Sequence, residues 1–590
     1  MKQPINRNIF WCETFVNILS DSGLSNVCIS PGSRSTPLTL SFSMNNKFRI
    51  YPIVDERSSA FFALGLAKKS KLPTVIVTTS GTAVSEIYPA IIEAYYQRIP
   101  LIVCTADRPA YLRNRGANQT INQNNIYKNH IRFFYDSGLP KINFSNINNL
   151  ITNTINGLDI ALNIDPGPVH FNFPFEKPFE PDTFTDNIDE NFFEKVKNTI
   201  KDISKKKSVS FSFDSSIKKF SDTLNEKRKG IIICGFINYG KEFQKALINF
   251  SEKFGYPIFA DGASGLRYST KAQKNIIVNY NTLIRSELFS QKYDPEIIFL
   301  VGGAPTSNQL QDFIKKSRAE KIIINEFGDK NDPTLTAKKI LNVNPVSFFY
   351  SLKPNKIKPD NDWVNNLIHL DKIVGDFKKS FFQNINYSFE SLVVNDLIEL
   401  LPNKCNLMIS NSLPIRDVDF FSECSTKEIK LFTNRGASGI DGINSTALGI
   451  ASVSKELTYL LTGDLAFYHD LTGLHNSIIF NIPLTVILIN NSGGGIFYSL
   501  PVSRFGKIFR QNFLTPLKLD FRKIVKAFGG IYYIATERKK LKEALRQSAN
   551  NKRLNVIEIK TDAKLSSRYR SLFWQSATKE VDRYINDHQS

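Results

Sequence analysis

Short apolar runs alternate with helical patterns along three parts of the chain. In the first part, Ala60, Ala63, Leu64 and Ala67 have the i, i+3, i+4, i+7 spacing of one helix face. Mostly apolar strands that alternate with helices are typical of parallel sheets covered on both faces. The pattern predicts an α/β protein with three doubly wound domains. The expected strands are 26–30, 50–54, 74–79, 101–105, 230–234, 257–260, 297–301, 321–325, 406–409, 458–462, 484–489 and 555–559.

Two polar stretches divide the chain into these three parts. Residues 181–229 are rich in Lys, Ser, Asp and Asn, and residues 352–361 contain two prolines, which disfavour regular structure. We therefore expect an N-terminal domain, a linker, a middle domain, a second linker and a C-terminal domain. Their expected bounds are 1–180, 181–229, 230–351, 352–375 and 376–590.

Polar residues follow two expected strands of the third part. Asp464 comes after the strand 458–462, and Asn491 comes 27 residues later, after the strand 484–489. Because the carboxyl ends of parallel strands meet at one edge of a sheet, both side chains can point toward one place. With a backbone carbonyl of the Gly-rich turn at Gly493, they offer the hard oxygen ligands that suit Mg²⁺.

The residues around Asp464 also suit a phosphate group. Gly463 permits close backbone approach, and the N–H groups of Leu465 and Ala466 could face a phosphate at the start of a helix. Taken alone, Gly-Asp after a strand is more often an ordinary turn. Its combination with Asn-Asn and three glycines at this spacing favours a site for a metal ion and a diphosphate.

The charge of the chain permits several kinds of partner. The 590 residues include 75 Lys and Arg against 55 Asp and Glu, a net charge of +20. Such a charge suits nucleic acid, an acidic membrane surface or anionic small substrates. The basic clusters at 205–207 and 227–229 fall in an expected linker, and neither an RNA-binding motif nor a helix-turn-helix pattern is present. We expect no nucleic-acid partner.

The remaining composition points to a reduced compartment. The six cysteines form no Cys-x-x-Cys pair and the six histidines have no metal-binding spacing, so neither a zinc site nor a disulfide framework is indicated. No apolar run reaches the roughly 18 residues that span a bilayer. The first residues lack the apolar stretch of a signal peptide. We expect a cytoplasmic protein without stable membrane insertion.

Several motifs together resemble one family of enzymes. Gly463-Asp464 followed by Asn490-Asn491 resembles the thiamine-diphosphate motif, although Leu465 stands where most such enzymes have Gly. Four further runs are similar to those of the 2-succinyl-5-enolpyruvyl-6-hydroxy-3-cyclohexene-1-carboxylate (SEPHCHC) synthase family of menaquinone biosynthesis. They are SPGSRSTPL at 30–38, GANQ at 116–119, NRGASGIDG at 434–442 and GGGIF at 493–497. The resemblance covers the first and third parts well and the middle part weakly.

The resemblance implies a fold, an activity and an assembly. The fold is the thiamine-diphosphate-binding fold, and the enzyme is a transferase that uses thiamine diphosphate with Mg²⁺ or Mn²⁺. Members decarboxylate 2-oxoglutarate and add the remaining succinyl-semialdehyde unit to isochorismate, giving SEPHCHC and CO₂. The active sites lie between subunits of a homodimer or homotetramer, because the first domain of one subunit holds the pyrimidine and the third domain of another holds the diphosphate.

The resemblance also implies roles for single residues. Glu56 is the catalytic acid that hydrogen-bonds to N1′ of the pyrimidine, and apolar neighbours raise its pKa. From the residues alone, Glu56 is more simply an acidic helix start, and Ile440, which would prop the cofactor in a bent form, is an ordinary core residue. The implied cofactor contacts are Glu56, Ser412, Ile440, Gly463, Asp464, Leu465, Ala466, Asn491, Ile496 and Phe497; the substrate contacts are Ser33, Arg34, Arg108, Asn118, Gln119, Arg416, Arg435 and Leu500; the metal ligands are Asp464, Asn491 and Gly493.

One part of the substrate site departs from the family. Arginine suits substrates with two carboxylates, because its fork binds a carboxylate at two points. Family members often carry a basic pair in the middle domain, but the matching run here, TSNQL at 306–310, has no positive charge. Either the amides of Asn308 and Gln309 serve instead, or another residue such as Lys315 or Arg267 does, or the alignment is shifted.

Two other functions are compatible with parts of the sequence. One is another thiamine-diphosphate-dependent 2-oxoacid decarboxylase or carboligase, such as an acetolactate-synthase-like enzyme. Leu465, the run at 30–38 and the set of arginines argue against it. The other is a basic nucleic-acid-binding protein, which rests only on the net charge.

Overall fold

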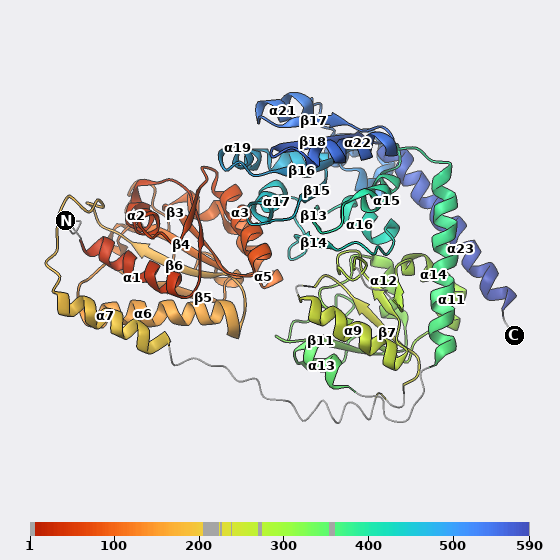
Figure 1. The fold of residues 1–590 in the computed structure, drawn as a ribbon, viewed down its shortest axis with the longest axis horizontal. Helices are drawn as coiled ribbons and strands as arrows, with labels where there is room; N and C mark the ends of the chain where they lie inside the picture. The colour runs from red at the N-terminus through yellow and green to blue at the C-terminus, as the bar shows by residue number, and fades with distance from the viewer. Residues whose placement is uncertain are drawn as a thin grey trace.

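Three six-stranded sheets, each with all its strands parallel, form the protein (Figure 1). This computed structural model describes residues 6–204, 224, 227–237, 239–269, 274–352 and 360–588. Helices lie on both sides of each sheet, so the predicted doubly wound α/β class is confirmed (Figure 1). The basic cluster at 205–207 lies outside the described residues.

The N-terminal domain has the strand order β2-β1-β3-β4-β6-β5. Its strands are β1 (Asn26–Ile29), β2 (Arg49–Pro52), β3 (Thr74–Thr78), β4 (Leu101–Asp107), β5 (Phe133–Asp136) and β6 (Val169–Pro174). Its helices are α1 (Arg7–Asp21), α2 (Thr36–Met44), α3 (Glu56–Ser70), α4 (Thr82–Glu86), α5 (Tyr88–Gln97), α6 (Phe144–Asp159) and α7 (Glu190–Ser204).

The middle domain has the order β12-β11-β10-β7-β8-β9. Its strands are β7 (Gly230–Cys234), β8 (Ile258–Ala260), β9 (Ile276–Ile277), β10 (Ile297–Val301), β11 (Glu320–Asn325) and β12 (Lys339–Asn342). Its helices are α9 (Lys241–Phe254), α10 (Tyr280–Leu283), α11 (Glu287–Lys292), α12 (Asn308–Lys316) and α13 (Pro345–Ser351).

The C-terminal domain has the order β14-β13-β15-β16-β18-β17, which repeats that of the N-terminal domain. Its strands are β13 (Cys405–Ile409), β14 (Ile429–Thr433), β15 (Thr458–Gly463), β16 (Leu484–Asn490), β17 (Ile531–Ile534) and β18 (Leu554–Lys560). Its helices are α14 (Asn361–Gln383), α15 (Glu390–Leu400), α16 (Leu413–Phe421), α17 (Ile443–Ser452), α18 (Asp464–His469), α19 (His475–Ile479), α20 (Gly506–Phe509), α21 (Phe521–Ala527), α22 (Arg538–Ala549) and α23 (Ala563–Asp587).

The strand order determines where a ligand can bind. In the N-terminal sheet the direction of winding reverses between β1 and β3, and in the C-terminal sheet it reverses between β13 and β15. At such a point the loops after the two strands leave in opposite directions and open a crevice at the carboxyl ends. The candidate residues follow these strands and their neighbours.

The strands that the sequence did not predict lie mainly at sheet edges. All the expected strands are present, with ends within two residues of the expected ones, but β5, β6, β9, β12, β14 and β17 were not expected. Apart from β6, each is the outermost strand of its sheet. An edge strand has a solvent-facing side, so it lacks the continuous apolar run of a central strand.

Two segments that we expected to be linkers contain helices. Helix α7 lies within 181–229 and packs its buried Val196 and its neighbours Phe192 and Phe193 into the N-terminal core. Helix α14 lies largely within 352–375 and buries Trp363 and Leu367. In both helices a narrow apolar stripe is flanked by charged residues, which gives the whole segment a polar composition. The bounds of the three domains stay a prediction.

Helices α3 and α17 join the N-terminal and C-terminal domains through a close crossing. A Cβ added at Gly65 would lie 2.1 Å from the backbone oxygen of Thr446, and one at Gly449 would lie 2.1 Å from the backbone oxygen of Phe62. The two helix backbones therefore touch at glycines. The apolar side chains around the crossing form one core shared by both domains.

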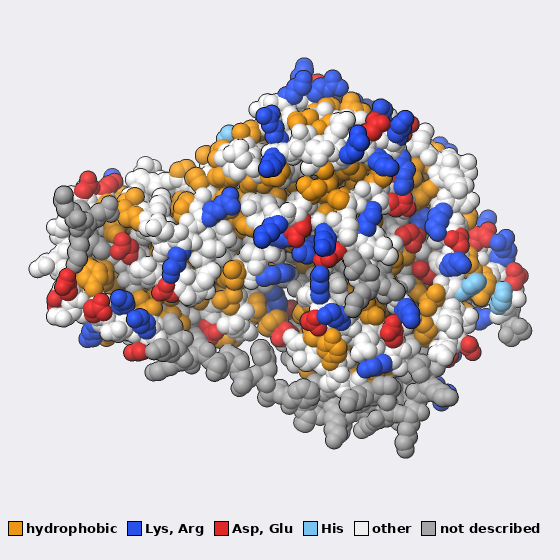
Figure 2. Space-filling view, in the orientation of Figure 1, with side chains coloured by type: hydrophobic (Ala, Val, Ile, Leu, Met, Phe, Trp, Pro, Cys, Tyr) orange, Lys and Arg blue, Asp and Glu red, His pale blue; other side chains and the backbone are white. Residues whose placement is uncertain are grey.

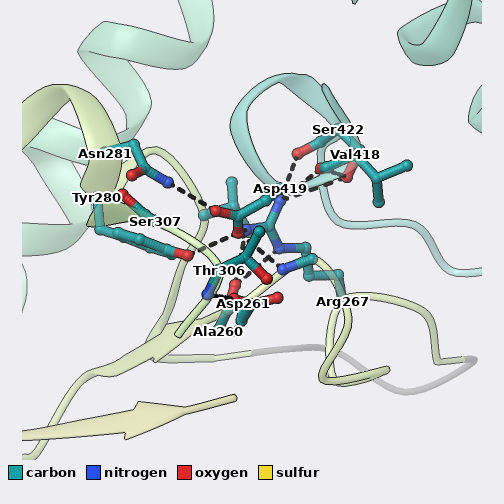
Figure 3. A network of polar contacts seen from close by, with 12 residues as sticks. Ala260, Asp261, Arg267, Tyr280, Asn281, Thr306, Ser307, Val418, Asp419 and Ser422 are labelled. Atoms are coloured by element: carbon teal, nitrogen blue, oxygen red, sulfur yellow. Dashed lines mark hydrogen bonds and ion pairs between the residues drawn. The ribbon is translucent and has the colours of Figure 1, made fainter. Parts of the chain in front are cut away.

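A fully buried ion pair joins the middle and C-terminal domains (Figure 3). The Nη2 atom of Arg267 lies 3.0 Å from Oδ1 of Asp419, and neither side chain has exposed surface. Every remaining polar atom of the pair has a protein partner. These partners are the backbone oxygens of Ala260, Val418 and Ser422 for Arg267, and the Gly262 N–H, the Tyr280 hydroxyl and the Asn281 amide for Asp419.

The surface carries both signs of charge. On the face seen in Figure 2, Lys and Arg side chains are scattered among Asp and Glu and do not form a single stripe. Within the described residues, no helix is both long enough and apolar enough to cross a membrane.

We predict that Arg267→Met lowers the free energy of unfolding by about 3–5 kcal/mol, because it leaves the Asp419 carboxylate buried without its cation. Urea denaturation followed by circular dichroism measures this change. Arg318→Gln is the control, because it removes an exposed arginine whose ion pair with Asp294 lies at the surface and contributes about 1 kcal/mol or less. A change in Arg267→Met as small as that of the control would contradict the prediction.

Candidate active site

Asp464 and Asn491 follow neighbouring strands of the C-terminal sheet. Asp464 is the first residue of α18, directly after β15, and Asn491 directly follows β16, which pairs with β15. The Oδ2 atom of Asp464 accepts the N–H of Gly493 at 2.7 Å, and Oδ1 accepts the N–H of Leu465 at 2.9 Å. Burial raises the pKa of Asp464 to about 7, and no cation in the described part of the chain forms an ion pair with this carboxylate.

The side chain of Asn491 presents an unpaired oxygen at the same place. Its Nδ2 atom donates to Oε1 of Glu390 at 2.8 Å, which fixes the orientation of the amide. Its Oδ1 atom is buried and has no hydrogen-bond partner among the described residues. Glu390 is held in turn by Arg570 at 2.7 Å. An under-neutralised carboxylate beside an unpaired amide oxygen is a donor set that fits a hard divalent cation.

The turn after β16 requires glycine. Gly493 has φ +126°, and a Cβ there would lie 2.0 Å from the backbone oxygen of Leu514. Ile496 and Phe497 follow in a single turn of 3₁₀-helix, half-buried, and Leu500 comes next with 48% of its surface exposed. The turn therefore brings its backbone close to Asp464, and three apolar residues that line a cavity follow it.

The loop that carries Ile440 is held by two helices of the N-terminal domain. The carboxylate of Glu93 in α5 accepts the N–H groups of Gly436 and Ala437, each at 2.7 Å. Lys68 in α3 donates to Oδ1 of Asn434 at 2.6 Å, and burial lowers the pKa of this lysine to about 7. These bonds fix the half-buried Ile440 relative to α3.

Arg416 and Arg435 lie together at the carboxyl ends of β13 and β14. Arg416 donates from Nη1 to the backbone oxygen of Ser412 at 2.7 Å, and Arg435 donates from Nη1 to Oδ1 of Asn411 at 3.3 Å. The pKa of Arg416 is lowered mainly by burial and further by Arg435. Ser412 has φ +74°, a strained conformation for a residue with a side chain. Neither guanidinium has a carboxylate partner among the described ion pairs.

A cavity of about 590 Å³ lies between the middle and C-terminal domains. It brings together three groups that the sequence singled out: Arg416, the apolar residues after β16 and the uncharged run at 306–310. Its lining includes Arg416, Ile496, Phe497, Leu500, Thr306, Asn308 and Gln309, together with Arg285, Arg570 and Trp574.

The N-terminal domain holds a second pair of arginines. Arg34 follows β1, and Arg108 follows β4. The pKa of Arg34 is lowered to about 10, mainly by burial and further by Arg108. Arg108 donates to the hydroxyl of Ser80, and Gln119 donates to the backbone oxygen of Ser80 at 3.2 Å. The other two expected residues of this group, Ser33 and Asn118, are exposed.

Glu56 is the first residue of α3 and is partly buried. Burial raises the pKa of its carboxyl, and the carboxylates of Asp55 and Glu86 add to this effect. Asp55, which precedes Glu56, accepts the N–H of Ser58 at 3.1 Å and caps the helix. Glu56 is therefore an acidic residue at a helix start, as the residues alone suggest. It also has the raised pKa that the resemblance implies.

Within the described residues of one chain, Glu56 and the arginine pair of the N-terminal domain lie apart from the cavity that Arg416 lines. The residues that line the cavity come from the middle and C-terminal domains and include neither Glu56 nor Arg34 or Arg108. Two residues were proposed to replace the missing basic pair. Arg267 forms its ion pair with Asp419, and Lys315 is exposed on α12. Neither lines the cavity.

Three residues of the site were not found from the sequence. Glu390 lies 101 residues from Asn491, and Glu93 lies 343 residues from Gly436, so no local motif relates them. Arg285 lies in a short connection between α10 and α11 with no motif around it. The only signal for Glu93 was a carboxylate within an otherwise apolar stretch of helix.

Comparison with known proteins identifies the domains. Residues 12–126 match the thiamine pyrophosphate enzyme, N-terminal TPP binding domain; residues 205–409 match the middle domain of thiamine pyrophosphate enzymes; residues 427–559 match the C-terminal TPP binding domain. Thiamine pyrophosphate is thiamine diphosphate. A solved structure of benzoylformate decarboxylase from Polynucleobacter necessarius matches with a TM-score of 0.65 at 15% identity, over 94% of this chain and 98% of that one, which shows the shared fold.

Relatives of similar length are more informative about the family. The SEPHCHC synthase of Bacillus cytotoxicus is 36% identical over 98% of both chains. That of Bacillus velezensis is 34% identical over 99% of both, and that of Haloquadratum walsbyi is 33% identical over 98% of this chain and 99% of its own. The chain therefore belongs to the SEPHCHC synthase family of thiamine-diphosphate-dependent enzymes.

Proposed function

We propose that this protein is a transferase that joins 2-oxoglutarate to isochorismate, forming SEPHCHC and CO₂ in menaquinone biosynthesis. The observation that carries the proposal is a cavity that Arg416, Ile496 and Leu500 line together. The last two follow β16, the strand after which Asn491 lies. This arrangement offers a cation for a carboxylate and an apolar wall within one space. The full-length similarity to SEPHCHC synthases supports it. Another 2-oxoacid decarboxylase or carboligase is not favoured.

Three oxygen donors of this chain would hold a magnesium or manganese ion. They are the Asp464 carboxylate, the unpaired Asn491 amide oxygen and a backbone carbonyl at Gly493. The ion would neutralise the buried Asp464 and bind the diphosphate. Glu390 would orient Asn491, as outer carboxylates do in metal sites. The other proposed cofactor contacts are Gly463, Leu465 and Ala466 near the diphosphate, and Ser412, Ile440, Ile496 and Phe497 near the rings.

Glu56 would supply the proton that activates the cofactor. When bound, thiamine diphosphate supplies the nucleophilic carbon that takes up a 2-oxoacid and releases CO₂. The raised pKa of Glu56 favours the protonated carboxyl, the form that would donate a hydrogen bond to a ring nitrogen. Its position at the start of α3, which is packed against α17, gives the carboxyl a fixed place.

The arginines would orient two substrates that each carry two carboxylates. Arg34 and Arg108 form one pair, and Arg416 and Arg435 form the other. In each pair, like charges are held close together without a carboxylate partner among the described ion pairs. A bound carboxylate relieves this repulsion through two-point hydrogen bonds. Ser33, Asn118 and Gln119 would add neutral hydrogen bonds, and Leu500 an apolar contact.

The complete site would form between two copies of the chain. Glu56 and the first arginine pair lie outside the cavity that holds Arg416. Large apolar side chains are exposed beside both halves: Val54 is 75% exposed near Glu56, and Phe505 is 61% exposed near Leu500. Figure 2 shows further apolar side chains gathered over the C-terminal domain. A homodimer or homotetramer would cover these residues, and the expected cytoplasmic location stays a prediction.

We predict that the protein releases CO₂ from 2-oxoglutarate in the presence of isochorismate with a kcat/KM at least about 100-fold above that for pyruvate. Pyruvate lacks the second carboxylate and leaves an arginine unpaired in the site. A coupled CO₂ assay measures both values, with isochorismate omitted as the control. A preference for pyruvate would support an acetolactate-synthase-like activity instead.

The variant Glu56→Gln should fold normally and lose about 10²- to 10⁴-fold in kcat, because it keeps the shape of the side chain but removes the transferable proton. Steady-state kinetics and the melting temperature test both parts. The matched control is Glu252→Gln, which changes an exposed glutamate of α9 in the middle domain and should keep wild-type turnover. Near-normal turnover of Glu56→Gln would rule out its catalytic role.

The variant Asp464→Asn should abolish the rise in melting temperature that Mg²⁺ with thiamine diphosphate gives the wild-type protein. Ligands at about 100 times Kd stabilise a protein by about 2.7 kcal/mol, and the variant lacks the carboxylate that binds the ion. Asp470→Asn is the control, because Asp470 is also buried but accepts from Ser445 in α17. It should lower the melting temperature and keep the shift. An undiminished shift in Asp464→Asn would contradict the metal site.

A further inference from the structure

Arg285 is a desolvated cation without a protein anion. Its guanidinium carbon lies 4.2 Å above the ring centre of Trp574 in α23, and its Nε atom is buried without a hydrogen-bond partner. Among the described residues, no carboxylate or carbonyl pairs with this side chain. Burial lowers the pKa of Arg285 to about 10. Holding a charge in this state costs free energy unless a ligand compensates it.

Two other buried arginines near the domain junction have carboxylate partners. Arg570, which lines the same cavity, binds Glu390 and Asp417 at 2.7 and 2.8 Å. Arg267 binds Asp419 in the core of the junction. Arg285 differs from them because its guanidinium has no anionic partner among the described residues. Its side chain lines a cavity.

The cavity places Arg285 with the substrate residues. Arg285 shares the lining with Arg416 and Leu500 from the C-terminal domain and with Asn308 and Gln309 from the middle domain. The last two occupy the position of the basic pair that the sequence lacks. The contact with the Trp574 ring holds the guanidinium at the cavity wall, and its N–H groups have no partner among the described hydrogen bonds, so they can bind a planar, two-point partner.

We infer that Arg285 binds a carboxylate of one of the two dicarboxylate substrates, in place of the basic pair missing at 308–309. This inference rests on the proposed function. Asn308 and Gln309 then supply neutral hydrogen bonds to the same substrate. Arg285 and Arg416 each take one anionic group from opposite domains, so a dicarboxylate bridges the middle and C-terminal domains across the cavity.

The test is steady-state kinetics of Arg285→Gln with each substrate varied in turn. Loss of a two-point bond to a charged group should raise the KM for one dicarboxylate about 10- to 100-fold, with kcat changed less than about threefold. The substrate whose KM rises identifies the carboxylate that is bound. If that substrate is 2-oxoglutarate, its analogue 2-oxobutyrate, which lacks the distal carboxylate, should show the same KM with the variant and with the wild type.

Three further variants separate binding from structure. Lys315→Gln removes an exposed charge from the same domain and should leave both KM values within twofold. Arg285→Gln combined with Asn308→Lys returns a cation to the other side of the same lining and should recover at least part of the lost affinity. If Arg285→Gln lowers the melting temperature by more than a few degrees, the same KM criterion is applied to Arg285→Lys, which keeps the charge and loses the fork.

The outcomes distinguish this inference from the proposed function. Absence of product with the wild-type protein would contradict the proposed function. Product formation by the wild type, with both KM values of the Arg285 variant within twofold, would overturn only the role of Arg285. A selective rise in one KM supports it.

Discussion

The crossing of α3 and α17 is the contact on which the arrangement of the site depends. The helix backbones meet at Gly65 and Gly449, where even a methyl group would overlap a backbone oxygen of the other helix. Helix α3 begins with Glu56, and α17 begins just after Ile440. Because this crossing allows almost no sliding, Glu56 of one domain and the loop with Ile440 of the other have a fixed relation. Glu93 and Lys68 add hydrogen bonds to the same loop.

The repeated strand order of the first and third domains explains why the charged groups come in two sets. Each sheet opens a crevice at its own reversal point, and each crevice is bordered by two arginines. We propose that the net charge of +20 has one functional part and one background part. The proposed functional part is the small group of desolvated arginines at the strand ends, of which Arg416 lines the cavity. The many exposed lysines are screened by solvent and salt over about 10 Å.

Central strands and local motifs were predictable from the sequence, whereas edges and distant partners were not. The strands β15 and β16 are continuous apolar runs, so their ends located Asp464 and Asn491 correctly relative to each other. The edge strands β12 and β14 have exposed positions, so their sequences could not be distinguished from those of loops. Glu390 and Arg285 reach the site only through tertiary packing, so their sequence neighbours give no sign of it. The replacement for the missing basic pair became visible only as a buried cation without a partner.

The central claim is that this chain forms SEPHCHC, and product identification tests it most directly. The purified protein is mixed with thiamine diphosphate, Mg²⁺, 2-oxoglutarate and isochorismate, and the products are analysed by mass spectrometry. We predict one new acid whose mass equals the sum of the two substrates minus CO₂. Release of CO₂ without this adduct would contradict the assignment of isochorismate as the acceptor.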